Sequence, residues 1–196
     1  MTSTTQNEPN KLRNRALIAL LGAAVIAAAS FLAPFTGRQV PTTSMLGAFA
    51  SILLIFLFLW RFPFRLYVCT IVFTLLANAF GSILGFYHLF AYYDKFVHGV
   101  SGILLAEVGY VFFERVQRGL RLSPNWRLTI LFALFFSIAC AGLWEVYEFT
   151  ADSLLSLQMQ GGNTDTVTDI IAGSAGAVLY AAVFWPIKRK ETAKRG

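Results

Sequence analysis

Long runs of apolar residues alternate along the chain with short polar connections. Crossing about 30 Å of hydrocarbon takes roughly 20 apolar residues in a helix, and six segments approach this length. They are residues 16–35, 44–60, 66–87, 96–113, 128–149 and 167–187, and their connections are rich in Pro, Gly, Arg and other polar residues. The pattern predicts an all-α fold, a polytopic membrane helix bundle with about six transmembrane helices.

The first apolar segment follows basic residues and contains the small-residue run AAAS, as a cleaved secretory signal would. Its apolar run is longer than a typical signal core and further spans follow, so we expect it to remain as the first transmembrane helix. We therefore expect a basic cytoplasmic N-terminal tail at residues 1–15, a single six-helix transmembrane domain at 16–187, and a basic cytoplasmic C-terminal tail at 188–196.

Composition supports this interpretation, because 57% of residues are hydrophobic and only 13% are charged, whereas soluble domains have about 25% charged residues.

The basic residues indicate the orientation in the membrane, because Lys and Arg near helix ends resist translocation. With a cytoplasmic N-terminus, all but Arg38 and Lys95 of the 16 cations fall on the cytoplasmic side. These are Lys11, Arg13, Arg15, Arg61, Arg65, Arg115, Arg118, Arg121, Arg127, Lys188, Arg189, Lys190, Lys194 and Arg195. Topology thus explains the net charge of +6 without nucleic acid, and predicts anionic lipid headgroups as partners of the basic cytoplasmic face.

The acids show the opposite distribution. Six of the ten acidic residues map to the outer ends of the fourth, fifth and sixth predicted spans, together with one of the two histidines. These residues are Asp94, His98, Glu145, Glu148, Asp152, Asp165 and Asp169. Because residues three, four and seven apart share a helix face, each span carries one polar stripe. The three stripes are therefore expected to face a common pocket at one membrane surface.

Small residues continue two of these stripes, with Gly102 below His98, and Gly173 and Gly176 below Asp169. Small side chains let membrane helices approach closely, so we expect tight contacts beneath the acids. Deeper in the fourth span, Glu107 lies on another face and is expected to form an interhelical hydrogen bond.

Structural roles compete with a functional role for these acids. Asp94 and Asp165 begin helices, where an Asp caps free N–H groups, so capping and a site role are equally well supported. Glu145 and Glu148 end an outward-running helix, where the helix dipole disfavours anions. Ionisable groups in membrane segments usually face the bundle interior and mark function, although a buried ion pair or exposure to headgroups remains an alternative for this stripe.

The acids have few nearby cations to neutralise them. Lys95 directly follows Asp94 and is expected to point about 100° away from it. Carboxylates with one imidazole suit Mg²⁺, Mn²⁺, Ca²⁺ or Zn²⁺, and Cys69 and Cys140, in separate apolar segments, suggest neither a disulfide nor a thiolate site. We therefore take all seven residues as candidate ligands of a divalent metal, with Glu145, Glu148 and His98 as catalytic candidates.

Three motifs, YDKFVHGVSG, LWEVYEFTAD and DTVTDIIAGSAGAVLY, resemble the YjdF-like family of bacterial inner-membrane proteins over roughly residues 85–180. The spacings Asp94-Lys95-x-x-His98 and Asp165-x-x-x-Asp169 are more distantly similar to VanZ-like proteins, which lack the stripe on the fifth span and have an Arg before the last span. The resemblance implies a multi-pass inner-membrane protein. VanZ-like proteins are linked to glycopeptide tolerance, which hints at the cell envelope.

Three functions are consistent with these features. A membrane-embedded, metal-dependent enzyme would act on a lipid-linked or phosphorylated envelope substrate, with a carboxylate or His98 as general base. A transporter or binding protein would take up a cation or protons through the same cluster, but would need polar groups leading to the cytoplasmic side. A structural membrane protein would pair its acids locally. We favour the first function by a small margin.

Overall fold

The computed structural model describes residues 7–157 and 159–193, which form helices joined by short connections; no strand occurs among them. The chain divides into two compact units, residues 1–93 and 94–196. Six helical segments of the described chain are long and apolar enough to cross a membrane, which confirms the prediction of an all-α polytopic bundle. Lys194 and Arg195 of the predicted basic tail lie outside the described residues.

Large apolar side chains cover the outer surface of the helices. Leu20, Phe31 and Phe58 are 66%, 70% and 72% exposed, and many other Leu and Phe side chains are similarly open. Extensive apolar surface on a water-soluble monomer is rare and promotes association. Lipid contact therefore accounts for these side chains, in agreement with the hydropathy of the segments.

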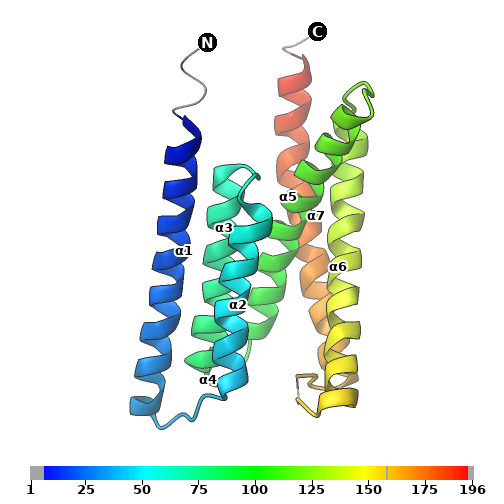
Figure 1. Cartoon of the computed structure of the whole chain (residues 1–196). Coiled ribbons are helices and arrows are strands. Elements are labelled where there is room, and N and C mark those ends of the chain that lie inside the picture. The colour runs from blue at the N-terminus through cyan, green and yellow to red at the C-terminus, as the bar shows by residue number, and fades with distance from the viewer. Residues whose placement is uncertain (1–6, 158, 194–196) are drawn as a thin grey trace. The chain divides into compact units, whose positions relative to one another are not determined.

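The first unit contains four α-helices, a short 3₁₀ helix and a π-helix (Figure 1). They are α1 (Asn7–Leu32), η1 (Ala33–Thr36), α2 (Thr42–Leu59), α3 (Phe64–Thr74), the π-helix η2 (Leu75–Ile83) and α4 (Phe86–Leu89). Residues 66–87 were predicted as one span, but the helix ends at Ile83. The next turn is broken at Gly85, whose φ of 83° is left-handed and favours glycine.

Arg15 is buried inside this unit, with only 7% of its surface exposed. Its guanidinium group donates to the carbonyl oxygen of Trp60, and to that of Phe62 at 2.7 Å. The Tyr67 hydroxyl in turn donates to the Arg15 carbonyl at 3.0 Å. Arg15 therefore joins α1 to the connection between α2 and α3. The charge pattern alone had indicated only its side of the membrane.

The second unit is built from three long helices (Figure 1). They are α5 (Tyr93–Gly119, whose first residue belongs to the first unit), α6 (Trp126–Leu155) and α7 (Asn163–Ala193). Each helix continues beyond the apolar segment that predicts it, because helical hydrogen bonds persist where the side chains become polar. At the start of α6, the Asn125 side chain accepts a hydrogen bond from the Leu128 N–H at 3.2 Å, as an N-cap residue does.

Glycines bring α5 and α7 into backbone contact. A Cβ atom at Gly102 would overlap the Gly173 carbonyl oxygen, and one at Gly176 would overlap the Gly99 carbonyl oxygen. The predicted close approach beneath the acids is thus confirmed. On the adjacent helix, the fully buried Ser137 hydroxyl donates to the Gly102 carbonyl at 2.8 Å, which ties α6 to the same level.

A second interhelical link lies near the middle of α5. The Tyr180 hydroxyl of α7 donates to Glu107 Oε2 at 2.5 Å, which confirms the predicted hydrogen bond. Tyr180 is 2% exposed and packs in an apolar cluster with Ala106, Ile130 and Ala133. The link and the glycine contacts hold α5 and α7 in register, so the residues at their first turns are placed together.

Candidate functional site

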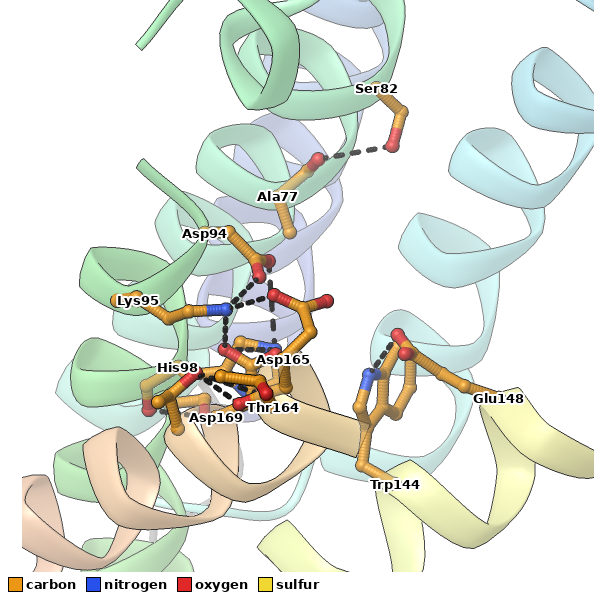
Figure 2. A network of polar contacts seen from close by, with 12 residues as sticks. Ala77, Ser82, Asp94, Lys95, His98, Trp144, Glu148, Thr164, Asp165 and Asp169 are labelled. Carbon is orange, nitrogen blue, oxygen red and sulfur yellow. Dashed lines mark hydrogen bonds and ion pairs between the residues drawn. The ribbon is translucent and has the colours of Figure 1, made fainter. Parts of the chain in front are cut away.

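Polar residues gather at the end of the second unit where α5 and α7 begin and α6 ends, which we call the acidic end. Asp94 lies in the first turn of α5, with His98 one turn further on the same face. Asp165 lies in the first turn of α7, with Asp169 one turn further. Figure 2 shows these four side chains gathered around Lys95. Two helix starts therefore supply the group, as the spacing predicts.

Lys95 is the centre of this group. Its Nζ atom lies 3.1 Å from Asp94 Oδ2, 2.5 Å from Asp165 Oδ1 and 2.8 Å from Asp169 Oδ1. The expectation that Lys95 points away from Asp94 is wrong, because their charged groups form an ion pair. That expectation considered α5 alone, whereas the glycine contacts place α7 within reach of the long lysine side chain. The acids of α7 thus lie on the side to which Lys95 points.

Three residues offer ligand atoms that converge on one point. His98 Nε2 lies 3.6 Å from Asp94 Oδ1 and 3.8 Å from Asp169 Oδ1, and the three ligand atoms all lie within 4.8 Å of one another. The His98 side chain is 12% exposed and that of Asp169 is 2% exposed. Two carboxylates and one imidazole at this spacing form an arrangement that fits a single divalent cation.

One buried carboxylate oxygen at the acidic end has no hydrogen-bond partner among the described residues. It is Oε1 of Glu145, a residue only 4% exposed, whereas Oδ1 of Asp169 is paired with the Lys95 ammonium group at 2.8 Å. Thr166 and His98 are among the polar groups around Glu145. A buried polar atom without a partner is unfavourable by about 1–3 kcal/mol, and by more when charged. This oxygen therefore indicates that a further ligand or proton belongs at the acidic end.

The charges of the group do not balance. Asp94, Asp165, Asp169 and Glu145 bring four carboxylates, against which the described residues place the single ammonium group of Lys95 and one imidazole. Carboxylates that share one lysine in this way repel one another strongly where the local dielectric constant is low. A divalent cation would reduce that repulsion, and the donor atoms present are of the type that such ions bind.

Glu148 has its hydrogen-bond partner outside this group, although its carboxylate is near enough to interact electrostatically with Glu145, Asp94 and Asp169. Its Oε1 accepts a hydrogen bond at 2.8 Å from the indole Nε1–H of Trp144, a residue that is 47% exposed. Figure 2 shows the pair on α6, apart from the residues around Lys95. The three-residue offset from Glu145 corresponds to about 60° around the helix. Glu148 therefore lies beside Glu145 on the same side of the helix, where it pairs with Trp144.

Asp152 also has other partners. It shares a face with Glu145 but lies about 10 Å further along the helix axis, beyond the group at Lys95. Its two carboxylate oxygens each accept a backbone N–H at 2.7 Å, one from Met159 and one from Gln160. Asp152 therefore shapes the connection between α6 and α7. The structure thus brings together Asp94, His98, Glu145, Asp165 and Asp169, and leaves Glu148 and Asp152 outside.

Sequence reasoning missed Lys95, Thr166 and Trp144. One signal was available for Lys95: it is one of only two cations that the charge pattern places at the side opposite the basic loops. A lone cation beside clustered acids is electrostatically expected to pair with them. Thr166 and Trp144 carried no comparable signal, because single Thr and Trp residues are common at helix ends.

The comparisons with known proteins agree with a membrane location. An "Uncharacterized protein" of Thermotoga maritima is 27% identical over 120 residues, which cover 61% of this chain and 59% of that relative. The match thus spans less than two thirds of the relative's length. No solved structure matches the chain. Residues 15–190 match the family described as "Predicted membrane protein (DUF2238)", and the chain therefore belongs to this family of membrane proteins.

Proposed function

We propose that the acidic end of this integral membrane protein binds a divalent metal ion through Asp94, His98 and Asp169. The supporting observation is the convergence of their ligand atoms within 4.8 Å, beside the buried Oε1 of Glu145, which has no hydrogen-bond partner among the described residues. Glu145 is proposed as an additional ligand or as a hydrogen-bond acceptor for bound water, and Asp165 as the partner of Lys95. Mg²⁺, Mn²⁺, Ca²⁺ and Zn²⁺ all suit oxygen and imidazole donors.

Lys95 does not prevent an ion from binding, because its ammonium group can be held by Asp165. Asp165 is not one of the three converging ligands. Lys95 Nζ is closest to Asp165, at 2.5 Å, and contacts Asp94 and Asp169 at longer distances. The ammonium group can therefore stay paired with Asp165 while Asp94 and Asp169 turn to the ion. In this arrangement Lys95 also supplies positive charge next to the ion, where an anionic substrate group would bind.

The protein is proposed to lie in the bacterial inner membrane with both termini in the cytoplasm. This orientation rests on the loops, which place all but two of the 16 Lys and Arg residues on one side. The acidic end then faces outward, at the level of lipid headgroups. A substrate there would keep its tail in the bilayer while its headgroup reaches the acids.

The proposed activity is hydrolysis or transfer on a lipid-linked or phosphorylated envelope substrate. A bound ion would neutralise phosphate charge and activate a water molecule. Because His98 would be a ligand, the general base is best assigned to Glu145, whose Oε1 is buried without a hydrogen-bond partner among the described residues. Lys95 would orient the anionic group. Glu148, bonded to Trp144 on the exposed side, is a weaker catalytic candidate.

Uptake of a cation or protons is the second candidate function, and buried polar groups below the acidic end support it. Along the second unit follow Ser137, then the Glu107–Tyr180 pair, and then Gln117, whose side chain donates to Thr129 at 3.3 Å. Polar residues inside membrane helices commonly mark ion or proton pathways. About 15 Å of α5 separate Glu107 from Gln117, so enzymatic action at the acidic end is favoured.

The experiment that tests the metal is elemental analysis of the full chain purified in detergent. After treatment with a chelator, Mn²⁺, Zn²⁺, Mg²⁺ or Ca²⁺ is added back and excess ion is removed. We expect stoichiometric metal in the wild type, loss of it in Asp169→Asn and His98→Asn, and retention in the matched control Asp152→Ala. Wild-type protein without stoichiometric metal, or equal metal in Asp169→Asn, would overturn the proposal. Size-exclusion profiles verify that the variants fold.

A further inference from the structure

A concave surface lies at the opposite end of the second unit, near the end of α7. It has a volume of about 340 Å³ and is lined by Trp185, Pro186, Arg189 and Lys190. Pro186 lies inside the helix and has no N–H, so α7 loses the hydrogen bond to the Ala182 carbonyl there. The surface thus combines an aromatic wall, a backbone irregularity and two cationic side chains.

Residues of α6 extend this surface. Trp126 packs against Trp185 edge to face, with ring centres 4.9 Å apart and an interplanar angle of 74°. The Arg127 guanidinium carbon lies 5.4 Å from the centre of the Trp126 ring, in cation–π distance. Two helices therefore hold paired tryptophans with a basic residue on each side. We call Trp126, Arg127, Trp185, Arg189 and Lys190 the basic aromatic patch.

The basic aromatic patch lies at the end of the membrane-spanning part of α7, where a membrane interface is expected. The candidate span of α7 ends at Ile187, between Trp185 and the cations. Trp residues are enriched at the boundary between hydrocarbon and headgroups, where the ring is apolar and the indole N–H is polar. Asp169 lies about 24 Å away along α7, which places the acidic end near the other boundary of a hydrocarbon core about 30 Å thick.

We propose that the basic aromatic patch binds the headgroup of an anionic phospholipid. The patch supplies Arg127, Arg189 and Lys190 for a phosphate, and the tryptophan rings cover the glycerol and upper acyl chains. Charge complementarity favours an anionic lipid over a zwitterionic one, because the acids of this unit gather mainly at the acidic end. Each Lys or Arg near an anionic membrane surface strengthens binding by about fivefold. This proposal is independent of metal binding at the acidic end.

The test measures lipid retained by the purified full chain. Detergent-solubilised protein is titrated with phosphatidylglycerol or with phosphatidylcholine, and bound lipid is counted by native mass spectrometry. We expect saturable binding of phosphatidylglycerol at least tenfold tighter than that of phosphatidylcholine. The double variant Arg189→Gln, Lys190→Gln should weaken phosphatidylglycerol binding by about tenfold or more. Trp185→Ala should also weaken phosphatidylglycerol binding, and its titration should no longer reach a clear plateau.

The matched control is Arg118→Gln, Arg121→Gln, which removes equal charge from the last turn of α5 and the connection after it without touching the patch. This control should change binding less than twofold. Equal losses in the two double variants would show nonspecific attraction and overturn the proposal, as would equal binding of the two lipids. Displacement of the lipid by millimolar inorganic phosphate alone would identify a soluble phosphate as ligand and would also overturn it.

Discussion

Arg15 of the first unit and Lys95 of the second are both cations within apolar parts of the chain, but different groups hold them. Arg15 donates to the carbonyl oxygens of Trp60 and Phe62, which carry no net charge. Lys95 is surrounded by the carboxylates of Asp94, Asp165 and Asp169. Arg15 supplies hydrogen-bond donors to backbone carbonyl oxygens in the connection between α2 and α3. Lys95 neutralises only part of the negative charge around it.

The comparison separates structural from functional polar groups in a membrane helix bundle. Around Arg15, the guanidinium hydrogen bonds fix the backbone between α2 and α3; its buried Nε has no hydrogen-bond partner among the described residues, but the group lies 5.7 and 5.6 Å from the ring centres of Phe64 and Tyr67. Around Lys95, the acids outnumber the cations, and Oε1 of Glu145 lacks a hydrogen bond from the described residues. Buried charge that the protein leaves unbalanced marks a place where a ligand contributes to stability. Substitutions at the two cations should therefore have different consequences.

The largest effect is expected for Arg15→Met. Removing the guanidinium group leaves two carbonyl oxygens of a partly buried connection without their charged donor, so the free energy of unfolding should fall by about 3 kcal/mol. Metal content should not change. Denaturant unfolding in detergent measures the first quantity and elemental analysis the second. Arg13→Met, at an exposed position of the same helix, is the control and should lose less than about 0.5 kcal/mol. Similar losses in both variants would contradict the structural role of Arg15.

The second effect concerns Lys95→Met, which should strengthen metal binding. The ammonium group competes with the ion for Asp94 and Asp169, so its removal should tighten the metal Kd by about tenfold, or about 1.4 kcal/mol. Calorimetric titration of chelator-treated protein measures this change. Lys95→Arg, which keeps the charge, should stay within about threefold of wild type. Metal binding that is weaker in Lys95→Met would contradict competition, whereas absence of metal in every variant would contradict the site itself.

The sequence predicted the helices and the meeting of α5 with α7 because both depend on local patterns. Apolar length gives the spans, and glycine spacing gives the contact at Gly102, Gly173 and Gly176. The partners of Arg15 and Lys95 could not be predicted in this way, since each depends on the angle at which a neighbouring helix or connection packs. A net excess of acids was visible in the sequence, but the placement of one lysine among three aspartates was not.

The same limit explains the stripe on α6. Spacing of three and seven residues correctly places Glu145, Glu148 and Asp152 on neighbouring parts of one helix surface. The spacing does not show how far around α6 the contact with α5 and α7 extends. It also does not show at which level along α6 those two helices begin. Only Glu145 lies both at the right depth and on the buried side.

A third, smaller effect is expected for Asp152→Ala, which resembles Arg15 in binding backbone groups. Loss of its two hydrogen bonds to the Met159 and Gln160 N–H groups should lower the free energy of unfolding by about 1 kcal/mol. Metal binding should be retained, since the carboxylate lies beyond the group at Lys95. The exposed neighbour Ser153→Ala is the control and should be nearly neutral. Loss of stoichiometric metal in Asp152→Ala would instead make this residue a ligand.

The smallest effect is expected for Glu148→Gln, which tests whether unbalanced charge extends beyond the group at Lys95. The Gln side chain keeps an oxygen that accepts from Trp144 Nε1, and the pair is partly exposed, so stability should change by less than about 0.5 kcal/mol. The metal Kd should stay within about twofold, because Glu148 supplies no converging ligand atom and contributes only through its charge. Calorimetric titration beside Glu145→Gln provides the comparison. Weakening by Glu148→Gln as large as that by Glu145→Gln would return Glu148 to the metal site and make the acid stripe of α6 one functional unit.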